Sequence, residues 1–515
     1  MKKETANSML RTAGFMAVAT MLAKIFGLVR DSMIGAYFST GIEADAFMTA
    51  SKLPTTLFDI VIGGVISATF IPVFNSIMAR DNKKEAMEFV NKFVTMILLI
   101  TTLIAVFGIV FADPLVQLLA PEFSGDKHAL AVQLTSIMFP MIIFTGLAFS
   151  FVGLLQSFGE YNIPSVISLV SNLAIILYFV LFGKKFGVQG LAVTMVIAWS
   201  LQLLIQVPSL HKLKVRYRPD FRLKDPNIKK AMLLAGPMLV STWVQPLYSI
   251  INSRLASGIN GAVSTLEYAN RLYIIVVGVF SFVVTNLIFP KLSRANANNN
   301  EREAHQLIVT SLKAVLLVIL PLMAGFMILS KPITSIIYEH GIFTQEDVLR
   351  VSSVLTCYSV GMVGLAVNEI LSKSFFSMQD SKTPMRNSIL SMVANIILAY
   401  VLFHFFQTNG LALAAAGGSV VNALLNYICI SRRYPSMFGK KDFVDLVKMV
   451  FSAGVMAVVV WGLYRVLGNV LPQAFVGNIL LGGGCALGGI VVYGLVCYLV
   501  RVEQIRALVS NLRKK

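Results

Sequence analysis

Several charged side chains lie inside long apolar segments of this sequence, where an ionisable group is costly unless it faces water or a partner. The first such segment contains Lys24, Arg30 and Asp31. Lys24, Gly27 and Asp31 are spaced by three and four residues, so they share one face of a helix with the glycine between the charges. A glycine at this place predicts either a bending point or the close approach of another group.

The second apolar segment carries a similar stripe of polar residues. It begins near Asp45, and Lys52, Asp59 and Gly63 follow on one helical face. Pro54 lies among them and removes one backbone hydrogen bond, which predicts a kink of the kind found beside membrane cavities. We therefore take Gly27, Pro54 and Gly63 as candidate hinges.

The second half of the chain repeats this arrangement of charges. Arg254 lies near the end of one apolar segment, and Glu267 and Arg271 stand four residues apart in the next. In an internal repeat with a single gap, Lys52 falls opposite Arg271. Each half of the chain therefore contributes a cation at an equivalent place.

Taken singly, pairs such as Arg30 with Asp31, or Arg271 with Glu267, could be internal ion pairs. Taken together, they predict a charged cavity for a ligand with phosphate groups, because guanidinium and ammonium donors match phosphate oxygens. The predicted substrate-binding residues lie in four equivalent apolar segments, and they are Lys24, Arg30, Asp31, Asp45, Lys52, Asp59, Arg254 and Arg271.

The amino-acid composition indicates that these apolar segments are surrounded by lipid. The 515 residues are 56% hydrophobic and 13% charged, with a mean hydropathy of +0.76, too apolar for a soluble domain. Runs of about 20 apolar residues, enough to cross a bilayer, recur along the chain, and we count fourteen, the first over Met9 to Tyr37. The five histidines and four cysteines lack ligand spacing, so we expect neither a metal nor a cofactor.

The short loops alternate in charge, which predicts the orientation of the spans. Basic connections occur at the amino terminus, around Arg80, from Lys212 to Lys224, and in the tail, whereas the intervening connections are neutral or acidic, with Lys184 and Lys185 as the exception. The positive-inside rule then places both termini in the cytoplasm and requires an even number of spans. We expect a multi-pass protein of a bacterial inner membrane, and no nucleic-acid partner despite the net charge of +18.

An internal repeat organises the chain. The stretch from Gly159 to Pro164 matches that from Gln379 to Pro384, and Gly190-Leu191-Ala192 matches Gly410-Leu411-Ala412, both at an offset of 220. We predict an all-α fold of two six-helix lobes, 1–215 and 228–435, related by a parallel pseudo-two-fold axis. A basic cytoplasmic linker, 216–227, joins the lobes, and two added helices with a basic tail occupy 436–515.

These features predict a carrier for an anionic substrate that bears phosphate groups, with the substrate path between the lobes. The sequence contains no Walker motif, so we expect an ion gradient or the membrane potential to supply the energy. A membrane glycosyltransferase or phosphatase would need clustered carboxylates or histidines at a membrane face, which favours a carrier over an enzyme. A scaffold without transport activity is the remaining alternative.

The sequence resembles the MurJ (MviN) family of lipid II flippases, within the multidrug/oligosaccharidyl-lipid/polysaccharide exporter superfamily. The likeness spans the whole chain and is carried by Phe26-Gly27-Leu28-Val29-Arg30-Asp31, Ala44-Asp45-Ala46-Phe47, Lys52-Leu53-Pro54, Phe70-Ile71-Pro72-Val73-Phe74, Tyr268-Ala269-Asn270-Arg271-Leu272 and Lys382-Thr383-Pro384. It implies a two-lobed, fourteen-helix flippase that moves undecaprenyl-pyrophosphate-linked peptidoglycan precursor to the outer leaflet by alternating access. It also implies a central cationic cavity, a lipid groove near the last two helices and contact with cell-wall synthesis machinery, in a protein we expect to be monomeric.

By position, the resemblance assigns functional arginines to Arg30 and Arg271, a cation to Lys24 and an acid to Asp45. Phe58 stands where many members have arginine, which implies either a weaker head-group site or that Lys52 or Arg254 replaces that cation. Some members resemble sodium-coupled carriers, and here only Asn252 and Asn395 stand as weak candidates for ion coupling. The alternatives are a flippase for another polyprenol-linked oligosaccharide and a drug or cation antiporter of the same superfamily.

Overall fold

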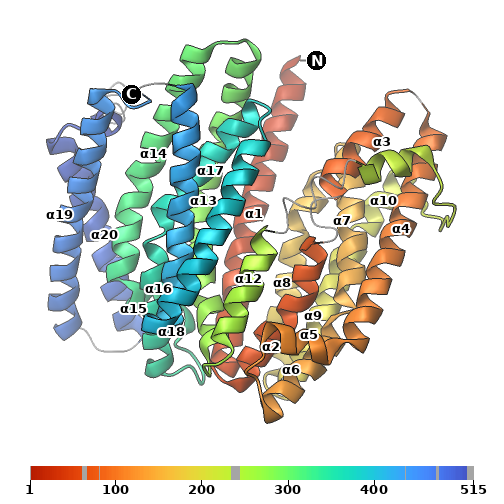
Figure 1. The fold of residues 1–515 in the computed structure, drawn as a ribbon, viewed down its shortest axis with the longest axis horizontal. Coiled ribbons are helices and arrows are strands. Elements are labelled where there is room, and N and C mark those ends of the chain that lie inside the picture. Colours follow the sequence, from red (N-terminus) through yellow and green to blue (C-terminus); the bar gives the residue numbers. More distant parts are fainter. Residues whose placement is uncertain are drawn as a thin grey trace. The chain divides into compact units, whose positions relative to one another are not determined.

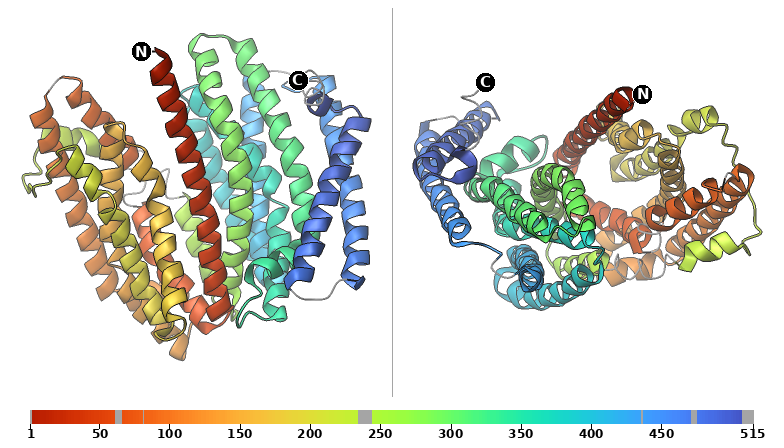
Figure 2. Two further views of the ribbon diagram at one scale, coloured as in Figure 1. Left: turned by 180° about the vertical axis from the view of Figure 1, so that it is seen from behind. Right: turned by 90° about the horizontal axis from the view of Figure 1, so that it is seen from above.

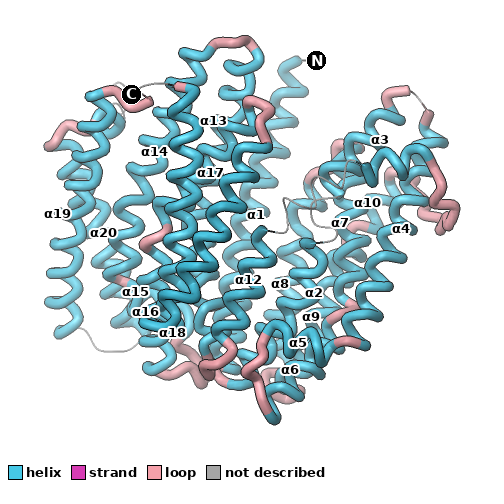
Figure 3. The backbone as a smooth tube through the Cα atoms, in the orientation of Figure 1, coloured by secondary structure: helices cyan, strands magenta, loops and turns pink. Residues whose placement is uncertain are grey.

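The computed structural model describes residues 2–506 apart from 61–65, 81, 234–243, 435–436 and 471–474. Within these residues the chain consists of helices joined by short loops (Figure 3), and the predicted all-α class is confirmed. Among the described residues, eight helices are long and apolar enough to cross a membrane, or nine if the bent pair Gln345–Ser359 and Met362–Ser377 is one span. The chain is a multi-pass membrane protein; fourteen spans are consistent with these helices, and that exact number stays a prediction.

The chain divides into two compact units, Met1–Ser264 and Thr265–Lys515. The division follows packing, whereas the predicted lobes follow the repeat, and the predicted lobe boundaries stay a prediction. The helices up to residue 264 are α1 (Lys2–Phe38), α2 (Ile42–Phe58), the π-helical turn η2 (Ile66–Phe70), α3 (Ile71–Met78), α4 (Lys83–Val110), α5 (Ala112–Leu119), α6 (Gly125–Met138), α7 (Met141–Ser157), α8 (Asn162–Phe182), α9 (Gly187–Leu204), α10 (Val207–Lys212) and α12 (Val244–Ala256).

The helices of the first unit run side by side as a bundle around a phenylalanine-rich core (Figures 1 and 2). Phe70 is fully buried and stacks on Phe74 and Phe89, with ring centroids 5.7 and 5.6 Å apart. Outward-facing positions are also apolar: Leu103 of α4 and Leu181 of α8 are 69% and 68% exposed. An apolar exterior is expected of a bundle whose solvent is lipid.

The second unit contains most of α13 (Ala262–Ala297) and the later helices. These are α14 (Glu301–Ile328), α15 (Ser330–Tyr338), α16 (Gln345–Ser359), α17 (Met362–Ser377), α18 (Lys382–Arg433), α19 (Lys440–Val470) and α20 (Phe475–Leu499). The added helices α19 and α20 pack on each other and on α14 (Figures 1 and 2).

A buried lysine ties these added helices to the unit. Lys313 of α14 is 3% exposed, and its Nζ lies 2.9 Å from Asp442, 2.8 Å from Asp445 and 3.0 Å from Glu503. Because a buried cation is tolerated only when it is paired, these contacts fix α14 against the start of α19 and the segment after α20.

The repeat predicted from the sequence is visible in helix starts and caps. α4 begins at Lys83 and α14 at Glu301, and each follows an asparagine cap, Asn82 or Asn300. Each asparagine side chain accepts a 3.1 Å hydrogen bond from the backbone N–H of the glutamate three residues later, Glu85 or Glu303. It also donates a hydrogen bond to the carboxylate of the same glutamate, at 2.8 Å for Glu85 and 2.9 Å for Glu303. This reciprocal cap satisfies otherwise orphaned groups at both helix starts.

The same polar positions hold helices together in both copies, at the predicted offset of 220. In the first copy the Gln206 side chain donates to the Ala148 carbonyl at 3.1 Å. In the second, the Asn426 side chain donates to the Asn368 side-chain oxygen at 2.7 Å. Between helices in lipid, such bonds contribute specificity that apolar contacts cannot supply. We call these contacts the amide seam.

α18 is 52 residues long because it joins two spans at one non-helical residue, Gln407, with φ 49° and ψ −127°. The residue 220 positions earlier, Gly187, also has a positive φ of 56° and is the first residue of α9, directly after the turn that follows α8. The second copy thus keeps the bend of the first without its glycine, and α18 counts as two elements of the repeat.

Candidate functional site

Arg30 lies on α1 in a fixed orientation. Its Nε and Nη2 donate to Asp31 Oδ1 at 2.9 and 2.7 Å, and its Nη1 donates to Asn172 Oδ1 of α8 at 2.9 Å. The two ion-pair side chains are 15% and 7% exposed. These bonds use three of the five N–H donors of the guanidinium, so the arrangement is an ion pair that leaves donor capacity for a further anion.

The glycine in front of this pair has a packing role. A Cβ on Gly27 would lie 3.4 Å from Asn172 Nδ2, and that nitrogen donates to the Ala23 carbonyl of α1 at 3.0 Å. Gly27 therefore lets an α8 side chain reach the α1 backbone, which is one of the two interpretations made from the sequence. Helix α1 continues through Gly27, so its role as a hinge stays a prediction. Lys24 is half-buried one turn earlier.

On α2, Lys52 is half-buried and its Nζ donates to Ser253 Oγ of α12 at 2.9 Å. Pro54 is buried inside the helix, and Asp59 is exposed at its end. Phe58, which stands where the resemblance would place an arginine, is 7% exposed and belongs to the aromatic core. A cation at that position would have to leave this core, so Phe58 is an apolar packing residue here.

The other predicted residues are dispersed. Asn252 of α12 and Asn395 of α18 are 8% and 6% exposed, and in the described structure each has a buried side-chain oxygen without a hydrogen-bond partner. A lone amide oxygen suits a cation, but their role in ion coupling stays a prediction. Arg254 and Arg271 are exposed on α12 and α13. Gly63 lies outside the described residues.

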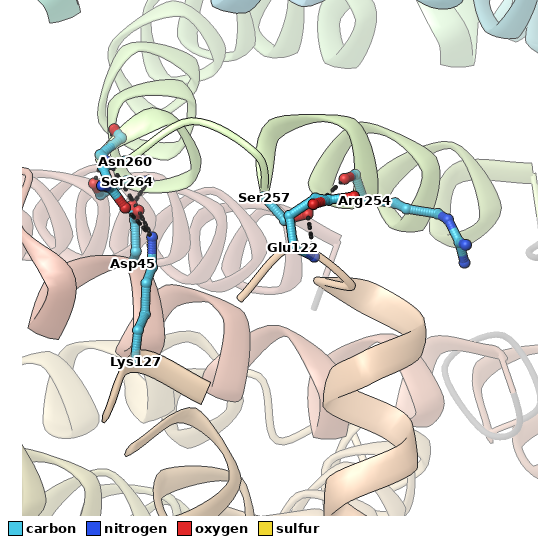
Figure 4. Close-up of polar contacts among 8 residues, drawn as sticks. Asp45, Glu122, Lys127, Arg254, Ser257, Asn260 and Ser264 are labelled. Atoms are coloured by element: carbon cyan, nitrogen blue, oxygen red, sulfur yellow. Dashed lines mark hydrogen bonds and ion pairs between the residues drawn. The ribbon is translucent and has the colours of Figure 1, made fainter. Parts of the chain in front are cut away.

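Asp45, at the start of α2, is fully buried and fully hydrogen-bonded (Figure 4). Its Oδ2 accepts from Lys127 Nζ at 2.7 Å and from the Gly261 amide at 2.8 Å. Its Oδ1 accepts from the amide and hydroxyl of Ser264 at 2.9 and 2.7 Å. The two amides flank the beginning of α13, where the positive end of a helix dipole favours a carboxylate.

Lys127 completes this network from α6. It is 7% exposed, also reaches Asn260 Oδ1 at 3.3 Å, and lies 4.1 Å above the Phe123 ring. Figure 4 shows Arg254 pointing away from the Asp45–Lys127 pair. Because protein groups occupy both oxygens of Asp45, its observed contacts position helices, and its predicted contact with substrate stays a prediction.

Gly261 is required by this geometry. Its φ is +78°, and a Cβ there would lie 2.5 Å from the Thr40 carbonyl oxygen. Only glycine tolerates both the left-handed backbone and this approach. The turn before α13 can therefore present its amide to Asp45.

Asn172 and Lys127 were missed by sequence reasoning. Asn172 is an uncharged residue inside an apolar span, and Lys127 stands in a polar stretch, Ser-Gly-Asp-Lys-His, that reads as an ordinary loop and helix start. The one local signal for Asn172 was its polarity within α8. For Lys127 the sequence offers none, because its burial depends on residues 82 and 133 positions away.

Comparison with known proteins gives the family. A family model described as "Lipid II flippase MurJ" matches residues 34–480. A "Probable lipid II flippase MurJ" of Buchnera aphidicola is 29% identical over 454 residues, 87% of this chain and 88% of the relative. The "Lipid II flippase MurJ" of Burkholderia cenocepacia is 28% identical over 452 residues, 85% of this chain and 87% of the relative.

Solved structures support the same fold. One described as "Lipid II flippase MurJ, inward closed conformation" has a TM-score of 0.79 at 22% identity, covering 96% of this chain and 99% of that one. An inward-facing MATE-family multidrug transporter of the MOP superfamily has a TM-score of 0.68 at 16% identity, covering 81% and 95%. With the family model matched over most of its length, this chain belongs to the MurJ family of lipid II flippases.

Proposed function

We propose that this chain is a lipid II flippase. It carries undecaprenyl-pyrophosphate-linked peptidoglycan precursor from the cytoplasmic to the outer leaflet of a bacterial inner membrane, with both of its own termini in the cytoplasm. The supporting observation is the family match over residues 34–480, combined with a partly buried arginine on a membrane helix. The basic loops at one end of the spans support the orientation.

The pyrophosphate is the part of such a substrate that the charged helices can recognise. Asp31 and Asn172 hold the Arg30 guanidinium while leaving two N–H donors for an incoming phosphate. Substrate could also compete for Asp31's place, because a doubly charged pyrophosphate attracts the guanidinium more strongly than one carboxylate. Lys24, Lys52, Arg254 and Arg271 are the further cations assigned to the head group, with Asp31, Asp45 and Asp59 shaping the site.

Alternating access would use the repeat. The six-helix lobes 1–215 and 228–435 move relative to one another, the linker 216–227 joins them, and 436–515 accompanies the second lobe. The Asp45 contacts close the start of α2 onto the turn before α13, so they must break for that end to open. Gly27, Pro54 and Gly63 are the proposed bending points.

The test is complementation in cells depleted of their own lipid II flippase. The readout is lipid II accessible to an externally added enzyme that hydrolyses it. Arg30→Ala and Arg271→Ala should lose surface lipid II and growth, and Arg30→Lys should retain part of both. The control is Lys185→Ala, which changes an exposed loop cation and should complement fully. Full complementation by both arginine-to-alanine variants would overturn the proposal.

The substrate of the flippase has one close alternative, a different polyprenol-linked oligosaccharide. The lipid-linked intermediate that accumulates on depletion separates the two, because only a lipid II flippase leaves lipid II behind. An antiporter of drugs or cations shares the fold but would favour carboxylates over the cations found here.

Surface lipid II that disappears when the membrane potential is dissipated would support the membrane potential as the driving force for transport, and an unchanged level would exclude it.

A further inference from the structure

The linker 216–227, taken here together with the four residues before it, is held against the first four turns of α4. The Arg218 amide donates to Asn91 Oδ1 at 3.0 Å, and the Tyr217 hydroxyl lies 2.9 Å from Thr95 Oγ1. Further along, Lys92 Nζ pairs with Asp225 at 2.6 Å. These contacts make the linker a fixed surface of the first unit.

The depth of this surface follows from α4. Its uncharged apolar run is Phe93–Val110, which spans about 27 Å of helix and so fills the hydrocarbon core. The turns up to Lys92 therefore lie at the level of the lipid head groups. Because the linker is bonded to Asn91 and Lys92 just outside this run, and to Thr95 in its first turn, it lies at that level too.

Side chains of the linker sort into two sets. Val215 is 7% exposed, and it packs with Tyr217 and Leu223 in the core of the unit. The cations before, between and after them are all exposed, and we call this set the basic row: Lys212, Lys214, Arg216, Arg218, Arg222 and Lys224. Phe221 is 67% exposed among them.

The linker's two carboxylates neutralise a single cation of the basic row, Arg222. Asp220 is paired with Arg222 at 2.9 Å, and Asp225 is paired with Lys92 of α4. The hydrogen bond from Arg222 lowers the pKa of Asp220 to about 2. For Asp225, burial raises the pKa, but hydrogen bonds from Lys92 and the Asn227 amide outweigh it and leave the pKa lowered. Both acids stay ionised at neutral pH and remain committed to these cations.

We propose that the basic row is a docking surface for anionic phospholipid head groups of the leaflet surrounding this end of α4, with Phe221 inserted beside them. Lipid phosphates are the anions present at this depth, and cations just outside a membrane span attract them. An exposed aromatic ring among the cations gains from entering the interface, as ring side chains do at membrane surfaces.

The test uses the full chain carrying Phe221→Trp in nanodiscs of phosphatidylglycerol or phosphatidylcholine, with the parent protein measured for its three native tryptophans. In phosphatidylglycerol we expect the added emission to shift to shorter wavelength and to be quenched by brominated lipid. In phosphatidylcholine we expect a weaker effect. Raising the salt from about 0.05 M to about 0.5 M should remove the difference.

A charge variant tests the basic row itself. Changing Lys214, Arg216, Arg218 and Lys224 to glutamine leaves the Arg222–Asp220 pair intact. Each cation near the surface is worth about fivefold in preference for anionic lipid. The phosphatidylglycerol fraction needed for half-maximal quenching should therefore rise at least about fivefold. The matched control removes four exposed cations of the other unit, Lys291, Arg294, Lys440 and Lys441, and should keep the parent value.

Three results would overturn the proposal. One is equal quenching of Phe221→Trp in the two lipids. Another is a tryptophan that stays exposed to water in every disc. The last is a control variant that loses the preference as fully as the row variant, because the effect would then reflect net charge and not this surface.

Discussion

Removing Asp45 should damage the protein more than removing its partner Lys127. Asp45→Ala leaves Lys127 charged at 7% exposure, and an unpaired buried charge costs about 3–5 kcal/mol. It also leaves the Gly261 and Ser264 amides without their acceptor, at about 1 kcal/mol or more each. The expected total is about 5 kcal/mol or more.

Lys127→Met removes the cation but leaves Asp45 three donors, the Gly261 amide and the Ser264 amide and hydroxyl. The expected cost is therefore about 1–3 kcal/mol. In the double variant no charge is left unpaired, so its loss should be close to or below that of Asp45→Ala alone. The two positions should thus show a coupling free energy of about 2 kcal/mol.

The assay is thermal unfolding of the purified chain in detergent, followed by the fraction that stays monodisperse. The order of midpoints should be parent, Lys127→Met, then the double variant and Asp45→Ala together. Glu43→Ala, an exposed acid in the same first turn of α2, is the control and should lie near the parent. Strict additivity of the two single shifts, or a larger loss for Lys127→Met, would refute this account of the network.

Other contacts make shorter predictions. Asn172→Ala should lower surface lipid II in the complementation assay while the chain still accumulates in the membrane, because the Arg30 guanidinium loses one of its two hydrogen-bond partners. Unchanged transport would show that Arg30 does not need Asn172 to orient it. Lys313→Met should lower the unfolding midpoint by the equivalent of about 1.5–3 kcal/mol, since buried Asp445 loses its 2.8 Å bond and keeps the weaker 3.7 Å contact to Lys448, and adding Asp445→Asn should restore part of the loss. With a pKa of about 2, Asp220 stabilises the linker above its unfolded pKa of about 3.9, and this contribution is lost as pH falls through about 2; a Phe221→Trp emission change centred near pH 6 would contradict this.

The helices and the repeat were predictable because they depend on local signals. Apolar runs give the spans, and the offset of 220 between Pro164 and Pro384 recurs in the starts of α8 and α18. The bend at Gln407 was less visible, because the first copy marks it with Gly187 and the second does not.

The site was predictable only as a set of residue types. A charged residue inside an apolar span is easily recognised in the sequence, so Arg30, Asp31 and Asp45 could be selected as candidate site residues. Whether each meets a substrate or a protein partner depends on side chains far along the chain, such as Asn172 for Arg30. The sequence also did not show that Phe58 is buried in the aromatic core, because that burial depends on how the helices pack.

The amide seam has a consequence for how the chain assembles. Two apolar helices can slide past one another in lipid at little cost, but a carboxamide that must meet one particular oxygen fixes a single register. Gln206 does this in one half of the chain and Asn426 in the other, each with a partner from its own half. Newly inserted spans of the first half can thus align before the second half has been synthesised, and the second half can then align through its own contact.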